Sequence, residues 1–206
     1  MRASKKISSQ KKLIFSFVVD GECEYWYLEM LKDTEKSLKI NLSPEIYKKK
    51  TLEEQYKRMI ELAKECEKVF WIIDFDVIHK ETREAKTDKK TLFQKFEELY
   101  NKCKNNNKVI VIVNNPCLEY WFLQHFEQTS KPFGTYADLE KSLKKHLPDY
   151  EKTKRYYVEK TPDIYNRLKQ KLPTAISNAK KLGDFDFKNP ERGMTEMHKI
   201  FNILEL

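Results

Sequence analysis

The sequence predicts an α/β fold in which helices cover both faces of a mainly parallel sheet of four or five strands. Three short segments, LIFSFVV, VFWIID and KVIVIVNN, are almost continuously apolar. Such runs are typical of strands that are buried on both faces, whereas half-exposed strands alternate apolar and polar residues. Segments with helical spacing of apolar residues separate the runs and are long enough for right-handed crossovers.

The first elements alternate in this way. LIFSFVV is short and rich in β-branched and aromatic residues, so we expect a strand that ends in a turn at Gly21. CEYWYLEMLKDTEKSL follows with apolar residues at helical spacing. KINLSPEIY predicts a short second strand that Pro44 interrupts. Apolar residues three and four apart then predict a helix over residues 51–68.

The next elements continue the pattern. VFWIID and KVIVIVNN are predicted strands, with a helix over residues 92–103 between them. The polar segment 80–90 is expected to be a loop. After KVIVIVNN we expect a helix with Pro116 in its first turn, behind a capping asparagine.

From residue 129 onward, helical segments joined by Pro/Gly loops are expected. We therefore describe the chain as an α/β core over residues 13–128 and a mainly helical C-terminal region over residues 129–206 that packs on it. The two parts together are expected to form a single domain.

The chain is basic, with a formal net charge of +8, and residues 151–181 carry nine Lys/Arg against three acids. Tyrosines interleave with these cations, as in surfaces that hold phosphates while rings stack on bases. The candidate nucleic-acid contacts are Lys152, Lys154, Arg155, Tyr156, Tyr157 and Arg167. A lysine-rich helical face in water explains the same pattern, so a polyanionic partner is permitted and not required.

The four cysteines show no zinc-ligand spacing and are expected to be small buried hydrophobes in a reducing cytosol. No apolar run approaches the roughly 20 residues of a membrane span. No secretory pattern opens the chain. We therefore expect a cytoplasmic protein without a membrane partner.

Acidic residues follow two of the predicted strands. Asp74 and Asp76 lie two apart, a spacing that puts both carboxylates on one side of a strand. Mg²⁺, or Mn²⁺ in its place, would neutralise such a pair with oxygen ligands. Asp20 and Glu22 follow the first strand, and in parallel sheets ligands bind at this edge. Capping of the following helices by surface acids is the alternative explanation.

Further residues near the same edge are candidates for lining a site: Glu24, His79, Asn115, Glu119 and His125. The histidines are explained equally by packing, and Asn115 and Glu119 by helix capping and a favourable first-turn charge. The signatures of P-loop enzymes, dinucleotide-binding folds, serine hydrolases and zincins are missing from the sequence.

Four blocks of the sequence, VVDGECEYWYLEML, WIIDFDVIH, NNPCLEYWFLQHF and AISNAKKL…NPERGMTEMHKIFNIL, resemble the RloB family of AbiL-like defence proteins. They occur in order over nearly the whole chain. The resemblance implies a Toprim-type, Rossmann-like fold with a Mg²⁺-dependent site, encoded beside restriction-modification genes. In Toprim domains the DxD pair, here Asp74 and Asp76, holds Mg²⁺. The glutamate before glycine, an acid/base or a metal ligand, is replaced here by the shorter Asp20, whose part Glu22 or Glu24 could take.

The resulting interpretation is a metal-dependent nuclease of prokaryotic antiphage defence, with RNA and DNA equally open as substrates. Asp20, Glu22, Asp74 and Asp76 would be catalytic, and Asp20, Asp74 and Asp76 would bind metal. A non-catalytic nucleic-acid-binding or sensor subunit is an alternative, and a haloacid dehalogenase-like phosphatase with Asp74 as nucleophile is a weaker one. An ATPase or another defence protein is a candidate partner, and a homo-oligomer is left open.

Overall fold

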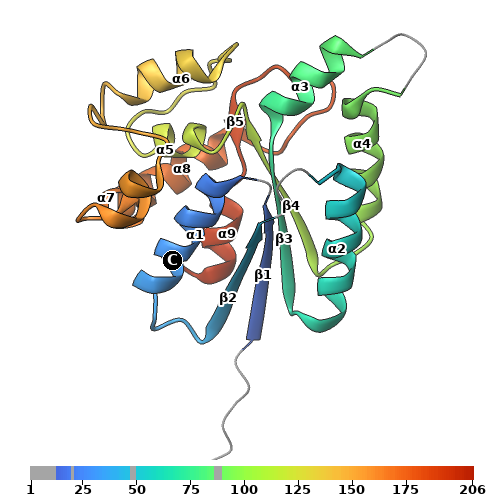
Figure 1. Cartoon of the computed structure of the whole chain (residues 1–206), viewed down its shortest axis with the longest axis horizontal. Helices are drawn as coiled ribbons and strands as arrows, with labels where there is room; N and C mark the ends of the chain where they lie inside the picture. The colour runs from blue at the N-terminus through green and yellow to red at the C-terminus, as the bar shows by residue number, and fades with distance from the viewer. Residues whose placement is uncertain (1–12, 20, 47–49, 86–89) are drawn as a thin grey trace, which may run out of the picture.

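The computed structural model describes residues 13–19, 21–46, 50–85 and 90–206 (Figure 1). The strands are β1 (Leu13–Val19), β2 (Ile40–Ile46), β3 (Lys68–Asp74), β4 (Val109–Asn115) and β5 (Met194–Thr195). The α-helices are α1 (Glu22–Thr34), α2 (Leu52–Glu65), α3 (Phe75–Glu84), α4 (Leu92–Cys103), α5 (Glu119–Gln124), α6 (Tyr136–Leu143), α7 (Ile164–Lys169), α8 (Leu172–Leu182) and α9 (His198–Leu204). A short π-helix, η1 (Arg155–Glu159), lies between α6 and α7.

The strands form one sheet in the order β2-β1-β3-β4-β5. The first four are parallel, whereas β5 pairs with β4 in the antiparallel direction. The predicted α/β class with a mainly parallel sheet is therefore confirmed. Pro44 lies inside β2, where it is tolerated because β2 is an edge strand and needs backbone donors on one side only.

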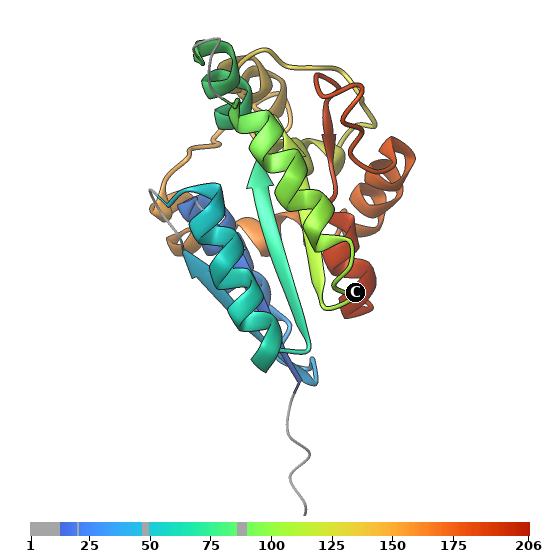
Figure 2. The ribbon, with the colours of Figure 1, turned by 90° about the vertical axis from the view of Figure 1, so that its right-hand side faces the viewer.

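Both faces of the sheet are covered, as the continuous apolar runs predict. On one face Phe17, Phe70 and Ile112 pack with side chains of α1, α8 and α9. On the other face Trp71 and Ile73 pack with α2, α3 and α4, and Figure 2 shows α2 and α4 lying over the strands. The C-terminal helices thus share one of the two cores with the sheet.

Local signals explain where two of the helices begin. Thr51 and Thr91 each accept a hydrogen bond from the backbone N–H three residues on. The side chains of Glu54 and Gln94 return a bond to the backbone N–H of the same threonine. These two capping boxes fix the starts of α2 and α4. The helix predicted over residues 92–103 is confirmed.

Two local predictions are wrong. The segment from residue 80 was expected to be a loop, but α3 begins directly after β3 and continues to Glu84. Pro116 was expected in a helical turn, but α5 begins only at Glu119. The carbonyl oxygen of Pro116 instead accepts hydrogen bonds from the backbone N–H groups of Phe75 and Asp76, at 2.8 and 3.0 Å. This contact joins the turns that follow β3 and β4.

A search of the helices within the described ranges finds none with the length and apolar character that a bilayer crossing requires.

Candidate active site at the carboxyl edge of the sheet

The carboxyl ends of β1, β3 and β4 meet at one edge of the sheet, because these strands are parallel. From this edge the chain continues into α1, α3 and α5 (Figure 1). Acidic side chains begin each of these three segments: Glu22 and Glu24 in the first turn of α1, Asp74 and Asp76 around the start of α3, and Glu119 at the start of α5. Topology therefore brings five acids from three distant segments of the sequence to the same edge.

Asp74 is the last residue of β3 and lies in register with Asn114 of β4. The side-chain amide of Asn114 donates to Asp74 Oδ1 at 3.3 Å. The carbonyl oxygen of that amide accepts from the hydroxyl of Thr195, at 2.7 Å. Asn114 and Thr195 are both fully buried. The carboxylate of Asp74 is thus oriented by a buried relay whose last member comes from β5.

Asp76 does not share the geometry that its spacing predicts. The strand ends at Asp74, so Asp76 belongs to the first turn of α3 and the two carboxylates are not successive groups on one side of a strand. Asp76 Oδ1 accepts from the backbone N–H of Val77 at 2.7 Å. Burial raises the pKa of Asp76 and nearby Glu119 raises it further, although the Val77 N–H and Lys152 oppose the shift.

Glu119 is the most enclosed of the acids that the structure describes at this edge, with 0% of its surface exposed. Its Oε1 accepts hydrogen bonds from the hydroxyls of Tyr150 at 2.7 Å and Tyr157 at 3.4 Å. The ammonium of Lys152 lies 3.2 Å from the same oxygen. A buried carboxylate needs a counter-charge and hydrogen-bond donors, and this arrangement supplies both.

Lys152 brings a cation to the acidic edge. Its side chain is 41% exposed, and its ammonium also lies 4.7 Å from the centre of the Tyr136 ring. Burial lowers the pKa of Lys152, but the negative charges nearby, Glu119 first, outweigh it and hold the pKa well above the ordinary value. Asp74 is among these charges. Lys152 therefore stays charged, anchored at one side and open to solvent at the other.

The acids that follow β1 differ in their surroundings. Glu22 is exposed, whereas Glu24 is buried and its carboxylate lies against Gly21, where a Cβ would overlap it. Glycine is thus required at position 21 because the Glu24 carboxylate leaves no room for a Cβ, and not because of an unusual backbone angle. Asp20 lies outside the described residues, so its expected role as a metal ligand and catalytic group stays a prediction.

Three of the expected site-lining residues have structural partners. The Nε2 atom of His79 lies 3.2 Å from the carbonyl oxygen of Pro190, and its ring packs on Phe75. Asn115 donates to the carbonyl oxygens of Pro190 and Arg192 and so does not cap a helix. His125 is buried, with Nδ1 3.0 Å from the carbonyl oxygen of Trp121. Among the expected lining residues, Glu119 and Glu24 are those that the structure places with the acids.

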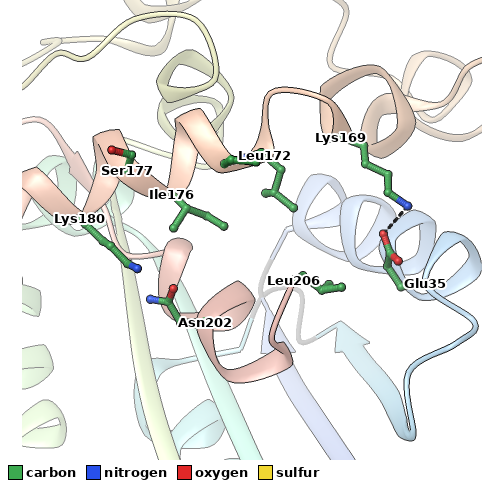
Figure 3. Close-up of a pocket in the computed structure, with 9 residues that line it drawn as sticks. Glu35, Lys169, Leu172, Ile176, Ser177, Lys180, Asn202 and Leu206 are labelled. Carbon is green, nitrogen blue, oxygen red and sulfur yellow. Dashed lines mark ion pairs between the residues drawn. The ribbon is translucent and has the colours of Figure 1, made fainter.

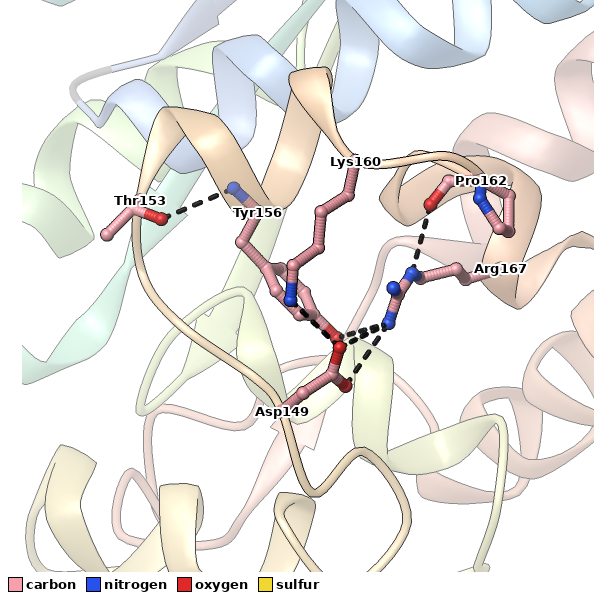
Figure 4. A network of polar contacts seen from close by, with 6 residues as sticks. All are labelled: Asp149, Thr153, Tyr156, Lys160, Pro162 and Arg167. Carbon is pink, nitrogen blue, oxygen red and sulfur yellow. Dashed lines mark hydrogen bonds and ion pairs between the residues drawn. The ribbon is translucent and has the colours of Figure 1, made fainter.

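The basic segment also differs from the expectation. Tyr156 and Tyr157 are fully buried, so the prediction that their rings stack on bases is wrong. Arg167 and Lys160 form ion pairs with the carboxylate of Asp149, at 3.1 and 2.9 Å (Figure 4). Both cations also lie against the aromatic ring of Tyr156. Lys154 and Arg155 are exposed. The expected nucleic-acid surface is thereby reduced to Lys152, Lys154 and Arg155.

The four cysteines are buried and unpaired, as the sequence predicts. A pocket of about 580 Å³ between α7, α8 and α9 contains none of the expected site residues (Figure 3). Its floor is apolar, with Leu172, Ile176 and Leu206, and Glu35 and Lys169 form an ion pair at 2.8 Å on its rim. It therefore does not belong to the acidic edge.

The donor chemistry of the edge suits a hard cation. Asp74 and Asp76 offer carboxylate oxygens, and Mg²⁺ is commonly held by one or two carboxylates with water completing its shell. Within the part of the chain that the structure describes, no group of three or more His, Cys, Asp or Glu side chains is arranged to hold a metal. A site at this edge would thus depend on the Asp74 and Asp76 carboxylates, with Asp20 as the expected third ligand.

Asn114, Thr195 and the pairing of Glu119 with Lys152 were not singled out from the sequence. The NNP block drew attention to Asn115, although Asn114 is the residue beside Asp74. Glu119 and Lys152 are 33 residues apart and approach only because the C-terminal region folds back over the sheet edge.

Comparisons with known proteins agree with the family resemblance. No curated protein matches the sequence. Among solved structures, an acetyl xylan esterase, AlAXEase, aligns with 17% identity and a TM-score of 0.38, covering 94% of this chain and 96% of that one. At this TM-score the likeness supports no conclusion. The sequence profile described as RloB-like protein matches residues 15–204. The chain therefore belongs to the RloB-like protein family.

Proposed function

We propose that this RloB-like chain is a Mg²⁺- or Mn²⁺-dependent nuclease that hydrolyses phosphodiester bonds of RNA or DNA. The observation that carries the proposal is the Asp74 carboxylate, which ends a central strand and is oriented by Asn114. Second-sphere hydrogen bonds of this kind are typical of carboxylates that hold metals. The family resemblance supports a role in prokaryotic antiphage defence.

In this proposal Asp74 and Asp76 hold the cation, and Asp20 or Glu22 completes the site or accepts a proton from water. The bound ion would supply charge stabilisation to a phosphate oxygen. Lys152 would bind a phosphate oxygen of the strand, because Glu119 fixes its ammonium beside the acids while its exposed side faces solvent. Lys154 and Arg155 would hold neighbouring phosphates.

The direct test is cleavage of labelled RNA and DNA oligonucleotides by the purified protein with Mg²⁺, with Mn²⁺ and with EDTA. Asp74→Ala/Asp76→Ala should abolish metal-dependent cleavage, and Asp33→Ala, an exposed acid of α1 away from the edge, should leave it unchanged. Cleavage by the purified double variant at the wild-type rate would show that another protein or another site is responsible.

A non-catalytic nucleic-acid-binding subunit is the second candidate. It is favoured by the lack of a three-ligand group of metal-binding side chains within the described residues. Tight oligonucleotide binding that EDTA does not change, without cleavage under any metal condition, would support this candidate over the nuclease.

A further inference from the structure

A second feature of the acidic edge is a pocket of about 450 Å³ on the face of the sheet covered by α2, α3 and α4. This volume is within the range of small-molecule sites, roughly 300–1,000 Å³. Ile73 and Asp74 at the end of β3 form one wall, and the other walls come from the start of α2, the inner side of α3 and the start of α4. Asp74 is thus among the residues that line the pocket.

The lining combines apolar and polar groups. Leu52, Ile73 and Ile78 are buried and form an apolar side, and Val77 is 48% exposed at the same place. Leu92 adds to the apolar part, and lysine, glutamate, glutamine, threonine and aspartate residues form the polar remainder. A nucleoside has the same division, because its base and sugar carry apolar faces and edges of hydrogen-bonding groups.

Gln55 supplies an oriented donor in this pocket. Its side chain is almost completely buried, and its Oε1 accepts from the indole N–H of Trp71 at 2.8 Å. Its amide nitrogen donates to the carbonyl oxygen of Lys50 at 3.3 Å. A glutamine amide has two N–H groups, so one donor remains for an acceptor atom of a ligand.

The two cations of the pocket form exposed ion pairs with glutamates. Lys50 pairs with Glu54 at 3.3 Å, and Lys95 pairs with Glu53 at 3.5 Å. Exposed pairs of this kind contribute little to stability, so either lysine can turn toward a phosphate. Glu53 and Glu81, also in the lining, can accept hydrogen bonds from amino groups of a base or from sugar hydroxyls.

We propose that this pocket is a mononucleotide subsite, which holds the nucleoside attached to the phosphate that Asp74 addresses. The assignment rests on the proposed function for the identity of the bound strand. Its own evidence is the pocket, its mixed lining and the donor of Gln55.

The indole signal of Trp71 offers a direct reporter. The chain has three tryptophans, and the Trp71 indole is bonded to Gln55 in the pocket wall. The Trp121 indole donates to the Tyr27 hydroxyl at 3.0 Å within the core on the opposite face and serves as an internal reference. Adding ribo- and deoxyribonucleoside 5′-monophosphates to ¹⁵N-labelled protein in EDTA should move the Trp71 signal saturably, at millimolar concentrations, and leave Trp121 in place.

Two variants complete the test. Val77→Trp places a bulky side chain at the pocket and should weaken nucleotide binding by roughly tenfold or more. Asn101→Trp, on the exposed side of α4 and outside the pocket, should leave binding unchanged. A Trp71 signal that does not move, that moves equally with inorganic phosphate, or whose titration is unaffected by Val77→Trp would overturn the subsite.

The outcome is separable from that of the proposed function, because binding is measured without metal and without cleavage. Asp74→Asn tests cleavage and Val77→Trp tests the Trp71 response, so each proposal has a variant of its own. A wild-type protein that shows the response but never cleaves would contradict the nuclease and keep the subsite. Cleavage without the Trp71 response would contradict the subsite and keep the nuclease.

Discussion

Asn114 donates its side-chain amide to the carboxylate of Asp74, across the junction of β3 and β4 and at 3.3 Å. Because the other end of the amide is bound by Thr195, its orientation is fixed and its N–H must face Asp74. A two-residue strand near the C-terminus, β5, therefore determines how the central acid of the site is presented.

This relay can be broken without changing side-chain volume. Thr195→Val removes the hydroxyl that Asn114 accepts from, and the buried carbonyl of Asn114 then lacks that donor. We expect the free energy of unfolding to fall by about 1–3 kcal/mol. We also expect Mn²⁺ affinity to fall by roughly 10- to 100-fold, as for other second-sphere changes. Thr195→Ser keeps the hydroxyl and is the matched control. Unchanged Mn²⁺ binding by Thr195→Val in calorimetry would argue against the relay.

The pair of Glu119 and Lys152 predicts an asymmetry between its two single variants. Lys152→Met leaves a fully buried carboxylate without its counter-charge, whereas Glu119→Gln leaves a lysine that can reach water. Urea denaturation should show a larger loss of stability for Lys152→Met, about 1–3 kcal/mol, because half-exposure of the lysine limits the effect.

The double variant Lys152→Met/Glu119→Gln should recover part of that loss, since no unpaired charge remains in the core. Equal stability of the two single variants, or a double variant as unstable as their sum, would mean that Lys152 does not neutralise Glu119.

The close approach of Gly21 and Glu24 predicts that substitutions at these two positions affect stability in a coupled way. A Cβ on Gly21 would overlap the Glu24 carboxylate, which is buried and has little room to move. Gly21→Ala should therefore lower the melting temperature, with a loss of about 1–3 kcal/mol that falls within the range for overpacked positions. In the Glu24→Ala background the same change should cost much less. A Gly21→Ala penalty that is the same in both backgrounds would place its cause in the backbone.

Two buried histidines should make the folded protein less stable at acidic pH. Burial lowers the pKa of His125 to about 4, and burial followed by the charge of Lys199 lowers the pKa of His198 to about 4. In the unfolded chain both imidazoles have the ordinary histidine pKa of about 6.5. Between about pH 4 and pH 6.5 the unfolded chain therefore binds more protons than the folded chain. The free energy of unfolding should thus keep its full value above about pH 6.5 and fall as the pH decreases toward about 4.

The measurement is urea denaturation of the wild type and of His125→Phe at pH 7 and pH 5. The variant has one fewer group to protonate, so its stability should fall less between the two conditions. An identical loss in both proteins would show that His125 does not contribute to the loss of stability at acidic pH.

Most of the sheet could be predicted because β1, β3 and β4 are buried on both faces and are therefore apolar throughout. The strand β5 has only two residues and therefore no apolar run from which it could be predicted. It nevertheless holds Thr195, which orients Asn114. The start of α3 was misjudged because Asp74 and Asp76 fit a strand period as well as a helix start. Tyr156 and Tyr157 were assigned to a binding surface because cations flank them, but the tyrosine ring is largely apolar and here fills the core.

In the proposed site, Asp74, oriented by Asn114, holds a divalent cation at the edge of the sheet. The most direct measurement is the anomalous difference density of crystals soaked in Mn²⁺. We predict a peak within about 2.0–2.6 Å of a carboxylate oxygen of Asp74, with Asp76 or Asp20 as a further ligand. Saturating Mn²⁺ that leaves no peak at Asp74, with the sheet edge open to solvent in the crystal, would mean that Asp74 does not hold a metal ion.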